Sequence, residues 1–136
     1  MDFNDQIAPF SWIEHDDGSA SVTMYTSHKY KKKLFKSRKK EGAIGSGYDW
    51  ESLAQAFIQE LTPDLHQAIC FDSEHLMFCA YSSDINALRR FVLMFKETCE
   101  NDNLIANIFS HAVLPKPVTK EDIRKVFDEI IGKSEK

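Results

Sequence analysis

Apolar and polar residues alternate with a period of two in two parts of the chain, as they do along half-buried β-strands. The first part runs over residues 7–16 and resumes after Gly18, where Val22 and Met24 fall on the apolar side. Gly18 accepts the positive φ that a tight turn requires, so these two runs predict an antiparallel β-hairpin.

The second alternating part covers residues 68–81. Ile69 and Phe71 precede the short polar segment 72–75, and the apolar run LMFCAY follows it. This pattern predicts a second hairpin. Its last strand is almost continuously apolar, so we expect that strand at the centre of the sheet, covered on both faces.

The other segments repeat their apolar residues three and four positions apart, which is the spacing of amphipathic helices. Asp49 is placed to cap one helix and Ser83 to cap another. A capping box of Thr119 and Asp122 is expected to start the last helix, which should stop at Gly132. The helices are expected at residues 29–41, 49–61, 84–99, 102–113 and 120–131.

In chain order the elements read ββ-αα-ββ-ααα. Hairpins separated by helices predict an α+β fold, in which an antiparallel sheet of two hairpins, about four strands, carries helices packed on it. The chain has 136 residues, of which 43% are hydrophobic, so one domain over residues 1–136 accounts for its length. We expect the tail at 133–136 to be frayed.

Location follows from what the sequence lacks. No apolar run approaches the roughly 20 residues that cross a bilayer, and the N-terminal sequence Met-Asp-Phe-Asn-Asp is acidic where a secretory signal would be basic. A cytoplasmic protein without a membrane partner is therefore expected. Cys70, Cys79 and Cys99 each lie in an apolar stretch and cannot all pair, so we interpret them as reduced core residues.

Charge is strongly segregated along the chain. The segment Lys29–Lys40 holds eight basic residues and no acidic ones, which leaves nine basic against 21 acidic residues elsewhere, a net charge of −12. The molecule is thus an acidic body with a basic patch. The patch could bind nucleic acid or an anionic surface, or it could be a solvated helix face on a protein whose acidic surface attracts a basic partner.

None of the candidate motifs completes a catalytic, cofactor or metal site. The glycine-rich segment 45–47 is not a phosphate loop, because Trp50 occupies the place of the third glycine. His15 and His75 stand beside carboxylates in polar hairpin tips, where solvated side chains are usual. We expect no enzyme activity, no cofactor and no metal; an enzyme would require a pocket where one of these histidines meets carboxylates.

The segment Tyr48–Glu51 allows two interpretations. Aromatic residues next to acids at a loop-to-helix junction are a common composition of interface hot spots. Trp50 equally begins an amphipathic helix, so packing in the core is the favoured alternative for that side chain.

Three stretches together resemble a known family. They are FSWIEHDDGSASVTMY, GSGYDWESLAQAF and FDSEHLMFCAYSSDINALRRF, and the similarity covers about residues 7–110. They look like the immunity protein 51 family, small bacterial proteins encoded beside polymorphic toxins. The resemblance implies that the chain protects the producing cell by binding the cognate toxin, and it transfers no catalytic residue.

If the toxin has a basic cleft, the acidic body would be steered to it and would pair with its cations. The residues expected to contribute to partner binding are Glu14, Asp16, Asp17, Tyr48, Asp49, Trp50 and Glu51. The alternative function is a nucleic-acid or anionic-surface binding module that acts through Lys29–Lys40, with nucleic acid as the less favoured partner.

Overall fold

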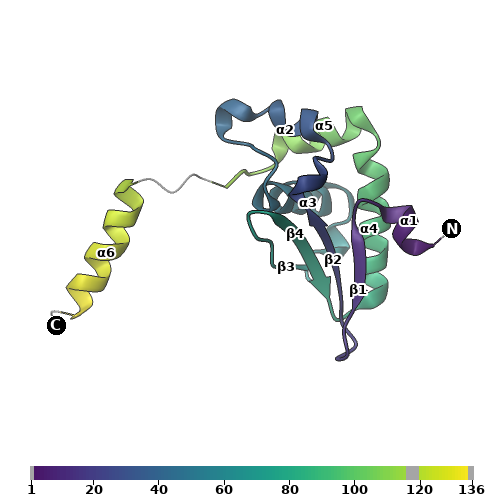
Figure 1. The fold of residues 1–136 in the computed structure, drawn as a ribbon, viewed down its shortest axis with the longest axis horizontal. Coiled ribbons are helices and arrows are strands. Elements are labelled where there is room, and N and C mark those ends of the chain that lie inside the picture. The colour runs from purple at the N-terminus through teal and green to yellow at the C-terminus, as the bar shows by residue number, and fades with distance from the viewer. Residues whose placement is uncertain (1, 116–119, 135–136) are drawn as a thin grey trace.

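The computed structural model describes residues 2–115 and 120–134 and confirms the α+β fold (Figure 1). In the described ranges the helices and strands are α1 (Phe3–Ile7), β1 (Ser11–Glu14), β2 (Ala20–Tyr25), α2 (Lys32–Lys36), α3 (Gly47–Leu61), β3 (Cys70–Phe71), β4 (Met77–Ser82), α4 (Ile85–Cys99), α5 (Asp102–His111) and α6 (Lys120–Ser134). Single 3₁₀ turns lie at Thr26–His28, Lys39–Glu41 and Pro63–Leu65. Over these residues, every helix is too short or too polar to cross a bilayer.

Both predicted hairpins form, and they join into one antiparallel sheet of order β1-β2-β4-β3. Strand β2 pairs with β4 along its whole length, from Ala20 opposite Ser82 to Tyr25 opposite Met77. The apolar strand β4 is therefore an inner strand, as predicted, but the expected cover on both faces is wrong, because Tyr81 on its second face is 40% exposed.

Helices cover one face of this sheet. Val22 and Met24 of β2 lie beside Ala80 and Phe78 of β4, and all four side chains are buried. Helix α3 packs on β4, and α4 packs on both strands (Figure 1). Tyr25 and Tyr81 alternate with those buried residues and are exposed, so the opposite face of the sheet is open.

Trp50 lies at the centre of the core, with 1% of its surface exposed. Its ring contacts the aromatic rings of Phe10, Tyr30, Phe35, Phe78 and Phe95. These residues come from the turn before β1, the basic segment, β4 and α4. The packing interpretation of Trp50 is therefore confirmed, and this ring joins the sheet, α4 and the basic segment in one core.

The predicted basic helix at 29–41 is shorter than expected. Only Lys32–Lys36 is α-helical, because Lys29 and Lys31 adopt left-handed backbone angles with φ of 54° and 56°. These turns bring Tyr30 onto the ring of Trp50, stacked at 5.8 Å between centroids. Aromatic packing here overrides the high helix propensity of the lysines.

Other boundaries also move. The first strand begins at Ser11 instead of residue 7, because the preceding residues form the short helix α1 and then a turn in which the Phe10 N–H donates to the carbonyl of Ile7. Asp84, one residue after the expected Ser83, caps α4. Asn101 caps α5 in the same way, and α5 ends at His111.

Helix α6 differs most from the expectation of a buried stripe. Ile123, Val126, Phe127 and Ile130 are about half exposed, and α6 stands apart from the other elements in Figure 1. The helix continues past Gly132, where it was expected to stop, to Ser134. The fraying expected at 133–136 stays a prediction. The capping role of Thr119 and the end of the tail at 135–136 lie outside the described residues.

A substitution at Gly47 tests the close contact between the start of α3 and the turn between β3 and β4. A Cβ at this position would overlap the carbonyl oxygens of Glu74 and Met77. Because backbone atoms of a turn cannot move aside as a flexible side chain can, Gly47→Ala should lower the free energy of unfolding by about 3 kcal/mol. Urea denaturation followed by circular dichroism measures this change.

Gly132→Ala is the matched control, because nothing lies within 4 Å of a Cβ at this helical position. It should leave stability unchanged or raise it by up to about 1 kcal/mol. Equal stabilities for the two variants would show that α3 does not approach the β3–β4 turn so closely.

Candidate functional site

Asp49 holds the loop that precedes α3. Its Oδ2 accepts hydrogen bonds from the backbone N–H groups of Ile44, Gly45 and Ser46, at 2.8, 2.9 and 3.2 Å. Ser46 Oγ accepts in return from the Asp49 N–H at 3.1 Å, which completes a capping box. The helix thus begins at Gly47, with Ser46 in the capping position that the sequence suggested for Asp49.

Backbone hydrogen bonds draw two further segments to this loop. The Gly47 N–H donates to the carbonyl of His75 at 2.9 Å, and the Thr26 N–H donates to the carbonyl of Leu76, also at 2.9 Å. The end of β2, the turn between β3 and β4 and the start of α3 therefore meet at one end of the sheet.

Large apolar side chains are exposed at this end. Tyr25 is 59% exposed, Ile44 69%, Tyr48 45% and Leu76 67%. We call these four residues the loop-end surface. Exposed aromatic and aliphatic residues that gather on a rigid support are characteristic of protein-binding surfaces.

Three carboxylates border the loop-end surface. The Glu51 carboxylate accepts a 3.4 Å hydrogen bond from the Ser73 N–H. Ser73 lies between Asp72 and Glu74, so all three acids lie at the turn between β3 and β4. Burial raises the pKa of the nearby Cys79 thiol, and the charges of these acids raise it further. Glu51, Asp72 and Glu74 form an acidic border.

The other predicted acids lie at the opposite end of the sheet. Glu14, Asp16 and Asp17 are in or beside the β1–β2 turn, next to Ala20, whereas the loop-end surface begins at Tyr25. Five residue steps along β2 correspond to roughly 17 Å. The structure therefore divides the predicted binding residues into two groups instead of one patch.

Hydrogen bonds within the β1–β2 hairpin hold two of these acids, Asp17 and Glu14. Asp17 Oδ1 accepts hydrogen bonds from the N–H and the hydroxyl of Ser19, which lower the pKa of Asp17 below its usual value. The Trp12 indole N–H donates to Glu14 Oε1 at 3.3 Å. Asp17 therefore shapes the turn, whereas no described residue bonds to the Asp16 carboxylate.

Burial separates Tyr48–Glu51 in the same way. Asp49 and Trp50 are 3% and 1% exposed, so they support the surface from inside and cannot contact a partner directly. Tyr48 is exposed and Glu51 lies in the acidic border. Sequence reasoning missed Tyr25, Ile44 and Leu76, because an apolar residue gives no sign in its sequence of whether its side of a strand or loop is covered.

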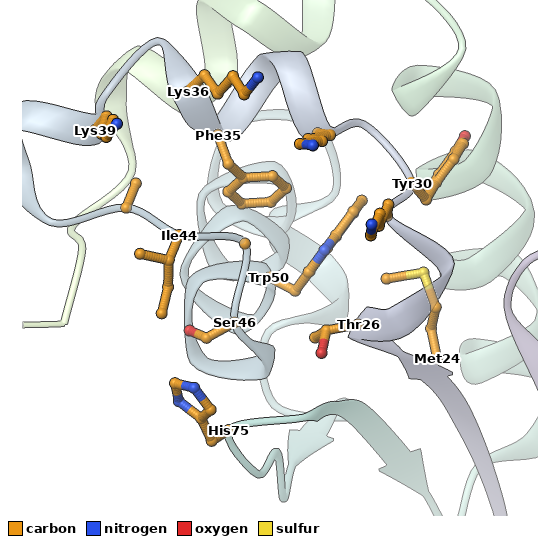
Figure 2. A pocket seen from close by; sticks show the side chains of 14 residues that line it. Met24, Thr26, Tyr30, Phe35, Lys36, Lys39, Ile44, Ser46, Trp50 and His75 are labelled. Atoms are coloured by element: carbon orange, nitrogen blue, oxygen red, sulfur yellow. The ribbon is translucent and has the colours of Figure 1, made fainter.

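A cavity of about 400 Å³ opens beside this surface. Figure 2 shows Phe35 and Trp50 between the segment that carries Lys36 and Lys39 and the turn that carries His75. The lining residues are Met24, Thr26, Lys29, Tyr30, Lys32, Phe35, Lys36, Lys39, Ala43, Ile44, Gly45, Ser46, Trp50 and His75. We call this cavity the lysine pocket.

The two histidines that stand beside carboxylates in the sequence lie at opposite ends of the sheet. His75 lines the lysine pocket, where the described lining includes no carboxylate. His15 lies at the other end of the sheet, with its Nε2 2.7 Å from Ser21 Oγ. Among residues 2–115 and 120–134, no three His, Cys, Asp or Glu residues gather in a way that could hold a metal ion.

Comparison with known proteins identifies one match. The family model described as immunity protein 51 matches residues 10–114. This range extends from the residue before β1 to three residues after α5, and it includes the loop-end surface and the lysine pocket. No curated protein and no solved structure matches significantly.

The cysteines provide a test of the open sheet face. Cys70 is exposed, whereas Cys99 is fully buried and burial raises its pKa to about 12. In the native protein at mildly alkaline pH, a thiol reagent should modify Cys70 first and Cys79 more slowly, and should reach Cys99 only after denaturation. Mass spectrometry of the labelled peptides measures this order. The exposure of Cys70 corrects the expectation that all three cysteines are core residues.

Glu74→Gln removes one charge that raises the Cys79 pKa, so this variant should label faster at Cys79 and unchanged at Cys70. Native labelling of Cys99 as fast as Cys70 would contradict the packing described here.

Proposed function

Because this chain belongs to the immunity protein 51 family, we propose that it binds and neutralises a cognate bacterial polymorphic toxin in the cytoplasm of the producing cell. The family match over residues 10–114 is the observation that carries the proposal. Immunity proteins of this kind act by binding, so the proposal assigns no enzyme activity, cofactor or metal to the chain.

The loop-end surface is the proposed centre of the toxin interface. Tyr48 supplies an exposed aromatic side chain on the first turn of a helix whose start is fixed by Asp49. Aromatic residues on rigid supports dominate binding energy at many interfaces, because little conformational entropy is lost when they are covered. Leu76 and Ile44 extend the apolar area around it.

Electrostatics supports a partner with a basic face. Glu51, Asp72 and Glu74 border the loop-end surface, and Glu14, Asp16 and Asp17 lie about one strand length away. We assign the acidic border to direct pairing with cations of the toxin. The turn acids contribute through long-range attraction, which speeds encounter without requiring contact.

The structure does not favour the alternative of single-stranded nucleic acid bound along Lys29–Lys40. That mode combines cationic side chains with exposed aromatic faces on which bases stack. The aromatic residues of the segment are Tyr30, whose ring packs on Trp50, and Phe35, which is 3% exposed. Their faces are occupied by the core.

Toxin neutralisation is tested directly in bacteria. The toxin domain encoded beside this gene should arrest growth when it is expressed alone, and coexpression of the full chain should restore growth. Purified toxin domain should capture the chain from a mixture of the two proteins. Growth arrest that persists at full expression of the chain would refute the proposal.

Binding kinetics separate the two groups of residues. Tyr48→Ala should raise the dissociation rate of the toxin complex about tenfold, because it removes a packed side chain from the interface. Asp16→Lys should instead slow association at low ionic strength and leave dissociation unchanged, with the difference disappearing in high salt. Surface plasmon resonance measures both rates.

Tyr81→Ala is the matched control for Tyr48→Ala, because Tyr81 is exposed to a similar extent, 40% against 45%, but lies on β4 near the β1–β2 turn. It should leave both rates unchanged. A larger loss from Tyr81→Ala than from Tyr48→Ala would move the interface to the open sheet face.

A further inference from the structure

The lysine pocket combines an aromatic floor with cationic side chains around it. Phe35 and Trp50 give it an apolar, aromatic floor (Figure 2), and Lys29, Lys32, Lys36 and Lys39 also line it. All four lysines line the pocket, although only Lys32 and Lys36 lie on the α-helix of this segment. A volume of about 400 Å³ is in the range that accommodates a bulky side chain.

We infer that the lysine pocket receives an acidic segment of the bound toxin, whose bulky apolar side chain enters the cavity while flanking carboxylates meet the lysines. This inference rests on the proposed function, and it adds a requirement on the partner. The toxin must present an acidic loop as well as a basic face.

The pairing of cations in the segment supports an anionic ligand. Lys31 Nζ lies 2.7 Å from Asp102 Oδ1, and Arg38 pairs with Glu41 at 2.8 Å. Within the described chain, none of the four pocket lysines has such a partner. Among the described residues, Lys33 and Lys40 outside the pocket lack such a partner too. The four lysines that line the cavity are the ones placed to attract an external anion to it.

Nucleobases do not fit the floor of the pocket. Tyr30 stacks on Trp50 with an angle of 4° between the ring planes, and Phe35 lies 5.0 Å from the Trp50 ring centroid. A base would need one of these faces for stacking, and each is already in contact with another ring.

A free phosphate group also lacks the directional donors that usually hold it. The N–H groups of Gly45 and Ser46 donate to Asp49, and that of Gly47 donates to His75. Arg38, which could bind an anion with two parallel hydrogen bonds, donates to Glu41 and to the carbonyls of Phe109 and Ala112. The lysines remain as flexible point charges, which suit carboxylates of a protein loop.

Continuity with the loop-end surface identifies the ligand as part of a protein. Ile44 belongs both to the pocket lining and to that surface, and it is 69% exposed. A partner that covers Tyr48 and Leu76 would therefore extend over the mouth of the pocket. Because Glu51 and Glu74 border the same surface, a partner must match carboxylates as well as lysines, which restricts its orientation.

The inference is tested with the full chain and the toxin domain. Lys36→Glu combined with Lys39→Glu reverses two pocket charges at exposed positions and should raise the dissociation constant of the toxin complex about tenfold at low salt. The effect should shrink in about 0.5 M NaCl, where the screening length falls to a few ångströms. Isothermal titration calorimetry measures both values.

Lys33→Glu combined with Lys40→Glu is the matched control. It changes the net charge by the same amount in the same segment, at exposed residues outside the pocket lining. The control should change the dissociation constant less than threefold, because its reversed charges lie outside the cavity that the toxin segment enters. Equal losses in the two double variants, or no loss in the pocket variant, would overturn the inference while leaving the proposed function standing.

A peptide titration tests the pocket without the toxin. The acetylated peptide EELFEE should shift backbone amide resonances of residues 29–46 in the full chain, and the pocket double variant should abolish these shifts. The peptide KKLFKK is the control and should cause none.

Stronger shifts with a short oligothymidylate than with EELFEE would overturn the inference in favour of nucleic acid. Failure of the wild-type chain to bind the toxin would refute the proposed function, and EELFEE shifts would then still decide the chemistry of the pocket.

Discussion

The carboxylate of Asp49 is the constraint on which the functional end of this molecule depends. It accepts three backbone hydrogen bonds from the loop before α3 while it is almost fully buried. A buried charge with these donors is stable only in one loop geometry, because removal of any donor would leave part of the charge unsatisfied. That geometry sets Gly47 against the β3–β4 turn, and this contact fixes where Tyr48 and Leu76 are presented.

Trp50 connects this constraint to the rest of the fold. Its ring, one residue after Asp49, touches aromatic residues from α4, β4 and the basic segment. A rigid core thus lies directly beneath the loop-end surface and forms the floor of the lysine pocket. Surfaces supported in this way lose little conformational entropy on binding, which suits the proposed role of binding a toxin.

Charges of both signs lie beside the loop-end surface, and they restrict which partner can bind there and in which orientation. The acidic border of Glu51, Asp72 and Glu74 flanks the loop-end surface, and the lysine pocket opens beside it. A partner with only one sign of charge would meet repulsion on part of this area. Immunity proteins must reject the toxins of other systems, and an interface that demands both signs in a fixed arrangement supplies such discrimination through unfavourable pairings as well as favourable ones.

The sequence by itself determined the α+β class, both hairpins and the family, because strand alternation, helical spacing and short motifs are local properties of the chain. It also indicated Tyr48 and Glu51 as candidates for the proposed interface, since an aromatic residue and acids at a helix start are a local signal. Only the tertiary structure decided that Asp49 and Trp50 point inward, that the turn acids lie a strand length from Tyr48, and that four unpaired lysines surround one cavity. Burial and charge pairing depend on which distant segments meet, and the Trp50 core, which bends the predicted basic helix at Lys29 and Lys31, brings those segments together.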